Sequence, residues 1–244
     1  MKKVPNTASR FLAFNLLNRD LWIAAQAALV PAGSRVLDVG AGSCPYRKLF
    51  DHCEYRAQDF QQLADEQLRH GRYGRIDYVC DAAAIPVGDA SFDVVVCTEV
   101  IEHVAEPQRL IQEFSRILKP GGLLLLTAPL GSGIHQEPHH YYGGFTPFWY
   151  HRFLLQHGFE GVSVEPNKGS FAFFAQESLR FLRSTAPWSL QARLVVRAVW
   201  APVWCGLLPV LGVLVPIAAH VWDEYDQEKR FTVGYHVKAQ KKHP

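Results

Sequence analysis

The segment Val36-Leu37-Asp38-Val39-Gly40-Ala41-Gly42-Ser43 combines a short apolar run with a glycine turn, and it limits the fold more than any other part of the chain. Gly40 and Gly42 let the backbone turn sharply and approach a ligand closely. Asp38 lies near the carboxyl end of the run, where strands of open α/β sheets bind ligands. The segment therefore predicts a buried strand that opens onto a nucleotide pocket.

Two further acidic residues follow this turn at set distances. A second short run, Glu54 to Gln58, ends in Asp59, which is 21 residues beyond Asp38. A carboxylate at this point can accept hydrogen bonds from both hydroxyls of a ribose. Asp81 follows a third run, Ile76 to Cys80. Three acids at three successive strand ends favour one shared pocket.

The rest of the central region continues the pattern. Ser91 to Cys97 is rich in consecutive β-branched residues, which is typical of a strand buried on both faces. Arg109 to Leu118 has helical spacing and stops at Lys119-Pro120-Gly121-Gly122, and Leu123 to Thr127 is another apolar run. We expect strands and helices to alternate throughout, in an α/β fold with a Rossmann-like, doubly wound sheet; the family resemblance described next implies seven strands.

Over about residues 30 to 165 the chain resembles the class I S-adenosylmethionine-dependent methyltransferases, most closely the group of quinone- and small-molecule-modifying enzymes. Five motifs in the family's order carry the resemblance: Val36 to Gly42, Asp59, Asp81-Ala82, Phe92 to Val96 with Glu99-Val100-Ile101-Glu102-His103, and Leu118 to Gly122. The resemblance implies S-adenosylmethionine as the cofactor and an in-line methyl transfer.

The same resemblance implies roles for individual residues. Gly40 and Gly42 would face the methionine part of the cofactor, Asp59 the ribose, and Asp81 the adenine amino group. The complete set of cofactor-binding residues implied in this way is Asp38, Gly40, Ala41, Gly42, Asp59, Asp81, Ala82 and Glu99.

A nicotinamide-dependent dehydrogenase is the competing interpretation of the glycine turn. Its fingerprint requires a third glycine three residues after the second, so that helix and strand can pack closely. Pro45 occupies that position here. Proline is tolerated in a first helical turn but does not reproduce the fingerprint, so the sequence disfavours a dehydrogenase.

Glu99-Val100-Ile101-Glu102-His103 follows the fourth strand. If a helix begins here, Glu99, Glu102 and His103 share one face at the rim of the sheet. In some similar methyltransferases this pattern holds a divalent metal, with a later histidine completing the site. In others Glu99 contacts the cofactor and His103 only packs. Carboxylate and imidazole suit Mg²⁺, Mn²⁺ or Zn²⁺, so both interpretations stay open.

The loop Gly131 to Thr146 follows the strand Leu123 to Thr127 and therefore emerges at the ligand-binding rim. Histidine can take a proton from a hydroxyl near neutral pH, and tyrosine offers a stacking face with a polar tip. We predict His103 or His139 as the catalytic base. The predicted substrate residues are His135, His140, Tyr141 and Tyr142.

Residues 168 to 229 form an unusual insertion. Ala198 to Trp222 contains no Asp, Glu, Lys or Arg, but Pro202, Pro209 and Pro216 argue against a straight spanning helix. The alternating run Arg230 to Lys238 predicts the final strand, which would pair antiparallel with Gly161 to Glu165. The insertion would then leave and return on one side, as a helical element at a membrane surface, a lid, or a homodimer interface.

These elements predict N-terminal helices within residues 1–30, a methyltransferase domain of residues 31–167 and 230–244, and the insertion between them. The net charge of +2 gives no general case for nucleic acid, and five cysteines without a Cys-x-x-Cys pair suit a reduced, cytoplasmic protein. We expect O-methylation of a small-molecule, glycan or lipid-linked acceptor, in the cytoplasm or on the inner face of the membrane. A non-catalytic cofactor-binding or scaffold protein and a nucleic-acid methyltransferase are the alternatives.

Overall fold

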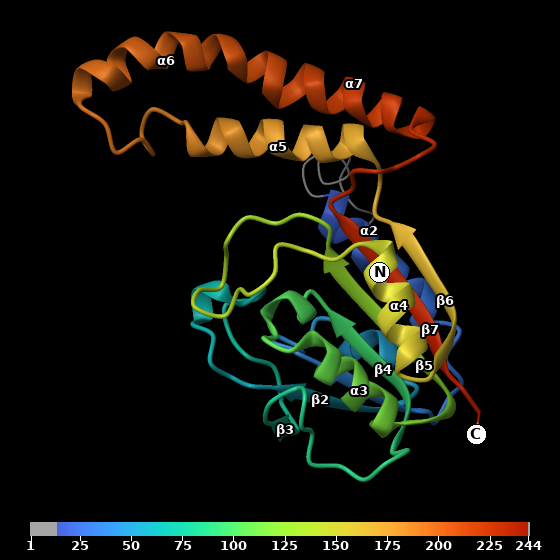
Figure 1. Ribbon diagram of the computed structural model, residues 1–244. Helices are drawn as coiled ribbons and strands as arrows, with labels where there is room; N and C mark the ends of the chain where they lie inside the picture. Colours follow the sequence, from blue (N-terminus) through green and yellow to red (C-terminus); the bar gives the residue numbers. More distant parts are fainter. Residues whose placement is uncertain (1–13, 244) are drawn as a thin grey trace. The chain divides into compact units, whose positions relative to one another are not determined.

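The computed structural model describes residues 14–243 (Figure 1). These residues fall into two compact units: residues 14–18 with 166–233, and residues 19–165 with 234–243. The second unit holds most of the sheet, and the first holds the helices that connect β6 to β7. Of the predicted N-terminal helices, α2 (Phe14–Ala27) is present, and residues 1–13 lie outside the described part.

The strands are β1 (Arg35–Val39), β2 (Glu54–Asp59), β3 (Tyr78–Val79), β4 (Phe92–Thr98), β5 (Leu118–Pro129), β6 (Phe159–Pro166) and β7 (Gly234–Lys241). The remaining α-helices are α3 (Pro107–Ile117), α4 (Pro147–Gln156), α5 (Ser170–Ser184), α6 (Leu194–Pro209) and α7 (Val215–Trp222). Four 3-10 turns cover Arg47–Phe50, Asp65–Gln67, Ile101–His103 and Asp223–Tyr225, and a π-helical segment covers Val210–Leu214.

The seven strands form one sheet in the order β3-β2-β1-β4-β5-β7-β6. β1 pairs in parallel with both β2 and β4, while β7 runs antiparallel to β5. The chain therefore winds outward in both directions from β1 and β4. Ligands of such sheets bind at the carboxyl ends of the strands where this winding reverses. The predicted Rossmann-like, doubly wound sheet is confirmed.

Alternate residues of the central strands fill two separate apolar layers, because successive side chains of a strand point to opposite faces. Leu37 and Val95 pack with α3 and α4 on one face, whereas Val36 and Val94 pack with α2 on the other. Both faces are buried, which explains the continuous runs of β-branched residues. This rigid core fixes the positions of the strand ends.

The prediction that helices alternate with strands throughout is wrong between β1 and β4. The connections in that region carry only the 3-10 turns Arg47–Phe50 and Asp65–Gln67. Pro45 and the glycines at 71 and 74 interrupt these segments, and glycine and proline are the poorest helix formers.

The final strand begins later than predicted. β7 starts at Gly234 rather than at Arg230, and it continues to Lys241. It lies between β5 and β6 in the sheet, and Gly234 stands opposite Pro129. A Cβ at Gly234 would collide with the backbone of Ala128, so the first paired residue must be glycine.

The other unit is dominated by α5, α6 and α7. Leu194–Tyr225 forms one continuous helical run that is long and apolar enough to cross a membrane by length and composition, and its most apolar 18-residue window has a mean hydropathy of 2.0. Pro202 and Pro209 lie inside α6, and the π-helical segment follows Pro209 directly. Proline has no N–H to donate to the carbonyl four residues earlier, and a π-helical turn can accommodate this missing hydrogen bond. The helix continues past both residues.

Candidate active site

The glycine turn after β1 is held in place by the end of β2. Gly40 N–H donates to the side-chain oxygen of Gln58 (3.2 Å), and Ala41 N–H donates to the Gln58 carbonyl (3.0 Å). Gly40 has φ of +65°, and a Cβ there would collide with the side chain of Val100. Only glycine satisfies both demands, and the turn consequently lies close against the rim.

Asp59 anchors the same turn. One carboxylate oxygen accepts from Gly42 N–H (2.8 Å) and the other from Gln61 N–H (2.8 Å). The residue is 3% exposed, and burial raises the pKa of its carboxyl although these backbone donors oppose the rise. Each oxygen keeps a lone pair, so the side chain can still accept from a ligand hydroxyl.

Asp38 lies within β1 and is buried. The hydroxyl of Tyr55, on the neighbouring strand, donates a hydrogen bond to its carboxylate. Burial raises the pKa of Asp38 to about 7, an effect that the Tyr55 hydrogen bond reduces and the nearby Asp59 carboxylate increases. Asp38 is thus a buried acid poised to change its charge near neutral pH.

The Asp81-Ala82 pair lies after β3. Asp81 is exposed, and its carboxylate accepts from the backbone N–H of Ala83 (2.8 Å) in a tight turn. Ala82 is buried and packs in the apolar layer that contains Leu37. The turn therefore presents the Asp81 carboxylate to solvent at the strand end.

Glu99 does not begin a helix, so that prediction is wrong. It has φ of +54°, and the chain then forms only the 3-10 turn Ile101–His103. The Glu99 carboxylate accepts from the Thr127 hydroxyl (2.8 Å) and pairs with Arg19 at 3.4 Å. These partners hold Glu99 away from the face that it was predicted to share with the next two side chains.

Glu102, His103 and His135 form the group whose ligand atoms lie within 4.8 Å of one another. Glu102 is 1% exposed, and neither of its carboxylate oxygens has a hydrogen-bond partner. Burial, followed by repulsion from Glu99, raises the pKa of Glu102 well above its ordinary value. An unsatisfied buried carboxyl group is costly and is therefore rare in a folded protein.

Backbone carbonyls fix the tautomers of the two histidines. Nδ1 of His103 donates to the His139 carbonyl (2.6 Å), and Nδ1 of His135 donates to the Gly133 carbonyl (2.9 Å). Nε2 of each ring therefore keeps its lone pair, and Nε2 of His103 lies 3.8 Å from Glu102. Burial lowers the pKa of His103 to about 4, so the ring is neutral at pH 7.

The rings of His140 and His139 have different contacts from those of His103 and His135. Both nitrogens of His140 are engaged, because Nδ1 accepts from His135 N–H (3.1 Å) and Nε2 donates to the Tyr142 carbonyl (2.8 Å). The His139 ring packs edge-on against Phe60, with ring centroids 5.1 Å apart. His139 thus contacts the histidine cluster through its carbonyl rather than through its ring.

Backbone hydrogen bonds hold the loop that carries these histidines against the 3-10 turn Ile101–His103. The backbone N–H groups of Tyr141 and Tyr142 both donate to the Glu102 carbonyl, at 3.0 and 3.1 Å. The Tyr142 hydroxyl donates to the Ala105 carbonyl (3.0 Å), while the Tyr141 ring is 53% exposed. Tyrosine faces and imidazoles therefore line one rim, next to the carboxyl ends of β4 and β5.

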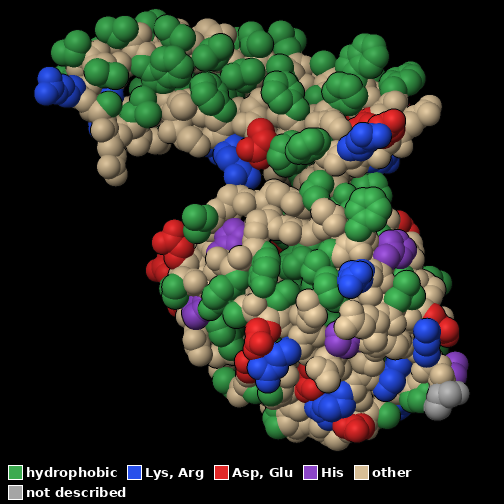
Figure 2. All heavy atoms as spheres, viewed as in Figure 1, with side chains coloured by type: hydrophobic (Ala, Val, Ile, Leu, Met, Phe, Trp, Pro, Cys, Tyr) green, Lys and Arg blue, Asp and Glu red, His purple; other side chains and the backbone are tan. Residues whose placement is uncertain are grey.

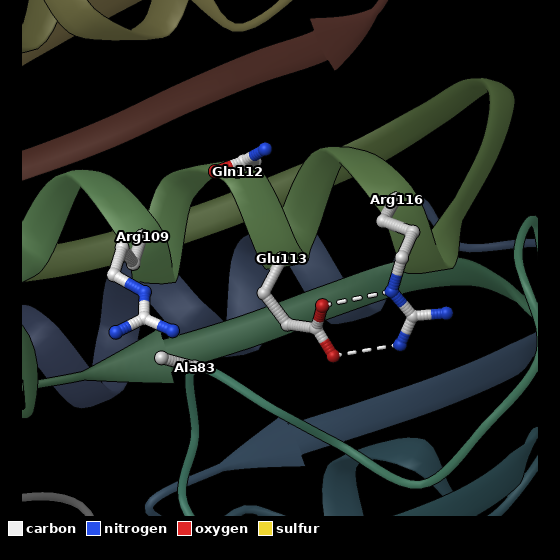
Figure 3. Close-up of a pocket in the computed structure, with 5 residues that line it drawn as sticks. All are labelled: Ala83, Arg109, Gln112, Glu113 and Arg116. Atoms are coloured by element: carbon white, nitrogen blue, oxygen red, sulfur yellow. Dashed lines mark hydrogen bonds and ion pairs between the residues drawn. The ribbon is translucent and has the colours of Figure 1, made fainter.

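A concavity of about 240 Å³ lies along α3, apart from the predicted site residues (Figure 3). Arg116 donates to both oxygens of Glu113, and it also contacts the carbonyls of Ile85 and Val87. These bonds hold the connection between β3 and β4 against α3. None of its lining residues is among the predicted site residues, and its contacts have a structural explanation.

Several residues of the site were not predicted from the sequence. Gln58 and Tyr55 anchor the glycine turn and Asp38, and Arg19 and Thr127 hold Glu99. Gln58 could have been suspected because it directly precedes Asp59. The remaining contacts join distant segments, and no local pattern announces them.

The sheet order, with a glycine turn and an acid after the next strand at its switch point, defines the class of Rossmann-like methyltransferases that use S-adenosylmethionine.

Comparisons with known proteins agree. The family model of the methyltransferase domain matches residues 37–126. An uncharacterized methyltransferase of Mycobacterium bovis (strain BCG / Pasteur 1173P2) is 32% identical over 206 residues, covering 80% of this chain and 76% of that protein. The chain belongs to the methyltransferase family and is an S-adenosylmethionine-dependent enzyme.

Solved structures support the fold. The [4+2]-cyclase SpnF aligns with a TM-score of 0.56 at 21% identity, covering 93% of this chain and 81% of that chain. A Haemonchus contortus phosphoethanolamine N-methyltransferase 2, in complex with S-adenosylhomocysteine, aligns with a TM-score of 0.54 at 20% identity. That alignment covers 93% of this chain and 53% of that chain.

Proposed function

We propose that the enzyme methylates a hydroxyl group of a small-molecule, glycan or lipid-linked acceptor. The observation that carries this proposal is the cluster of histidines at the rim: the ring centroids of His103, His135 and His140 lie 4.5 to 5.6 Å apart. Neutral imidazole accepts a hydroxyl proton, and the neighbouring tyrosines Tyr141 and Tyr142 offer faces on which a sugar or phenol ring can stack.

Methyl transfer requires alignment above all. S-adenosylmethionine supplies an electrophilic methyl group on its sulfonium sulfur; an acceptor oxygen forms the new C–O bond as the C–S bond breaks, leaving S-adenosylhomocysteine and one proton. The protein must hold the two reactants in line and receive the proton. His103 suits the second task, because its ring is neutral and its Nε2 lone pair has no partner.

The proposed cofactor site surrounds the switch point of the sheet. Asp38, Gly40, Ala41 and Gly42 would line the methionine end, and Asp59 would accept from the ribose. Support comes from the bonds of the glycine turn to Gln58 and Asp59, which preshape it. Asp81 and Ala82 would lie at the adenine, and Glu99 would contact the cofactor from the end of β4.

As an alternative to proton acceptance by His103, whose single free Nε2 lone pair can serve only one of the two roles, we propose a divalent metal at Glu102, His103 and His135, a donor set that includes His135 and leaves out Glu99. Two imidazoles and one carboxylate favour Mn²⁺ or Zn²⁺ over Mg²⁺, which prefers oxygen ligands. Ligands of a tetrahedral zinc ion lie about 3.4 Å apart. The present group, whose ligand atoms lie within 4.8 Å of one another, would therefore close by a loop movement of roughly 1–2 Å. Such an ion would stabilise an acceptor oxygen as its proton leaves.

Metal binding can be measured without turnover. At a metal concentration of 100 times Kd the gain in stability is about 2.7 kcal/mol, which raises the melting temperature by roughly 5–10 °C in a chain of this size. Titration with Mn²⁺ and Zn²⁺ should show this rise for wild type and for Glu99→Gln. Glu102→Gln, which keeps the shape of the side chain, should show none. A wild-type protein that responds to neither ion refutes the metal proposal.

Acceptor chemistry has a separate test. The purified enzyme, methyl-labelled S-adenosylmethionine and a source-cell lysate should yield a product that carries the label as a methyl ether. Label in the organic phase indicates a lipid-linked acceptor, and label in the aqueous phase indicates a free metabolite or glycan. Label found only on nitrogen or carbon would overturn the proposed O-methylation.

We place the enzyme in the cytoplasm, bound peripherally to the inner face of the membrane. Nucleic acid is not proposed as a partner, because a net charge of +2 does not favour a polyanion.

A further inference from the structure

The segment 169–226 forms an antiparallel helical hairpin, in which α5 packs against the continuous run from α6 to α7 (Figure 1). Indole N–H groups fasten the far end of the hairpin: Trp200 donates to the Thr185 carbonyl (2.6 Å) and Trp204 to the Leu182 carbonyl (3.0 Å). These bonds leave the two helices of the hairpin in a fixed register.

The hairpin is closed at its other end. Asp223, 2% exposed, accepts from the N–H groups of Gly169 (2.9 Å) and Ala172 (2.9 Å) at the start of α5. Asp226 accepts from Ser170 N–H (2.7 Å). The chain therefore enters and leaves the hairpin at the same end, and the hairpin is a defined structural element.

The hairpin exposes many large apolar side chains to solvent, which is energetically unfavourable in water. Within Leu194–Tyr225 the buried residues are Trp204, Pro216, Ala219 and Asp223, and all the others are half-buried or exposed. Hydrophobic side chains gather along α6 and α7 on the face that Figure 2 shows. Large side chains between 40% and 80% exposed are Phe171, Phe174, Phe181, Trp188, Leu194, Val195, Val196, Val199, Val203, Leu208, Val210, Val213, Leu214, Ile217, Val221 and Trp222. Exposed apolar patches of this kind mark interaction surfaces.

Between Glu177 and Asp223 the charged side chains of the hairpin are all arginines. They are Arg180, Arg183, Arg193 and Arg197, and this stretch of the sequence contains no carboxylate. Arg180 pairs with Glu177 at 3.2 Å, and this ion pair lies on α5. Arginines beside tryptophans and aliphatic side chains match the composition of elements that bind anionic membrane surfaces.

A second copy of the chain fits this surface poorly. A two-fold interface places the same patch on both partners, so Arg183, Arg193 and Arg197 of both copies would meet, and the nearby carboxylate of Glu177 already pairs with Arg180. Like charges brought together across an interface cost several kcal/mol. An anionic lipid surface neutralises the same arginines, and its acyl region accepts the apolar side chains.

The charged residues of α5 indicate how the hairpin would lie relative to a bilayer. Glu177, Arg180 and Arg183 lie in the middle and last turns of this helix. A hairpin inserted along the membrane normal would carry these groups into the hydrocarbon, where charged side chains are costly. A hairpin that lies in the plane of the interface keeps them among the lipid headgroups.

We propose that the hairpin 169–226 is a membrane-binding element that lies in the interface of an anionic bilayer, with the exposed side chains of α6 and α7 in contact with lipid. This binding does not depend on which acceptor is methylated. The failure of either proposal therefore leaves the other intact.

Flotation of the full-length protein with vesicles tests the inference. Wild type should float with vesicles of equal parts phosphatidylglycerol and phosphatidylcholine, and much less with phosphatidylcholine alone. Val199→Gln combined with Val203→Gln and Ile217→Gln should weaken binding on the order of 100-fold, because three apolar side chains lose their contact with lipid. Arg183→Gln with Arg193→Gln should weaken it roughly 30-fold.

The control is Leu29→Gln, which changes a side chain that is 73% exposed but lies in the sheet unit. It should float as wild type does, and circular dichroism should show that all variants keep their helices. Wild type that floats with neither vesicle overturns the inference. So does a wild-type dimer in solution that the Val199→Gln combination dissociates while flotation stays unchanged.

Discussion

Replacing Asp38 with asparagine should make the enzyme more stable above neutral pH than the wild type. Burial raises the pKa of Asp38 to about 7, against roughly 3.9 in an unfolded chain. Below pH 4 both states hold the proton, and the carboxyl does not affect the pH dependence. Between pH 4 and 7 only the folded state holds it, so the free energy of unfolding falls as pH rises, by about 4 kcal/mol in all.

Asparagine does not titrate, and its side-chain oxygen can still accept from Tyr55. The free energy of unfolding of Asp38→Asn minus that of wild type should therefore increase by about 3 kcal/mol between pH 5 and pH 8. Urea denaturation followed by circular dichroism at both pH values measures this difference. Tyr55→Phe removes the hydrogen bond that lowers the pKa of Asp38, and it should steepen the pH dependence. A difference that is equal at pH 5 and pH 8 refutes the reasoning.

Three further outcomes follow from the structure. Gly40→Ala should weaken S-adenosylmethionine binding at least about tenfold in calorimetry, because alanine at φ of +65° is strained and its Cβ meets Val100; unchanged affinity would contradict this. Asp223→Ala should destabilise the hairpin by about 2 kcal/mol, seen as faster hydrogen exchange in α5, and equal exchange rates would count against the proposed anchoring. Arg116→Met should lower stability but leave cofactor affinity unchanged, and a loss of affinity would show that the concavity along α3 belongs to the active site.

The sheet and the cofactor turn could be predicted because they depend on local patterns. Val36 to Gly42 fixes a strand and a turn by itself, and the distance to Asp59 follows from the length of one strand connection. The predicted seven-stranded, doubly wound sheet is confirmed. It could be predicted because buried strands need apolar runs, which the sequence displays.

The rim was harder to predict because its conformation depends on contacts between distant segments. Glu99 looked like the first residue of a helix, but Arg19 and Thr127 draw it into a left-handed conformation. The sequence also showed four histidines near the site without showing their tautomers. Those depend on the carbonyls of Gly133 and His139, which only the folded loop places.

The prediction of helices between β1 and β4 was wrong for a related reason. Alternation of helices and strands is a property of the whole fold, whereas Pro45 and two glycines act locally and prevent full helices.

The central claim is that this enzyme transfers a methyl group to a hydroxyl oxygen at its histidine-lined rim. The most direct measurement is isolation of the labelled product from wild type and from His103→Ala, each with methyl-labelled S-adenosylmethionine and the same lysate. The account predicts a methyl ether from wild type, and a large loss of product from His103→Ala with cofactor affinity retained. Label on nitrogen or carbon, or equal product from both proteins, would contradict it.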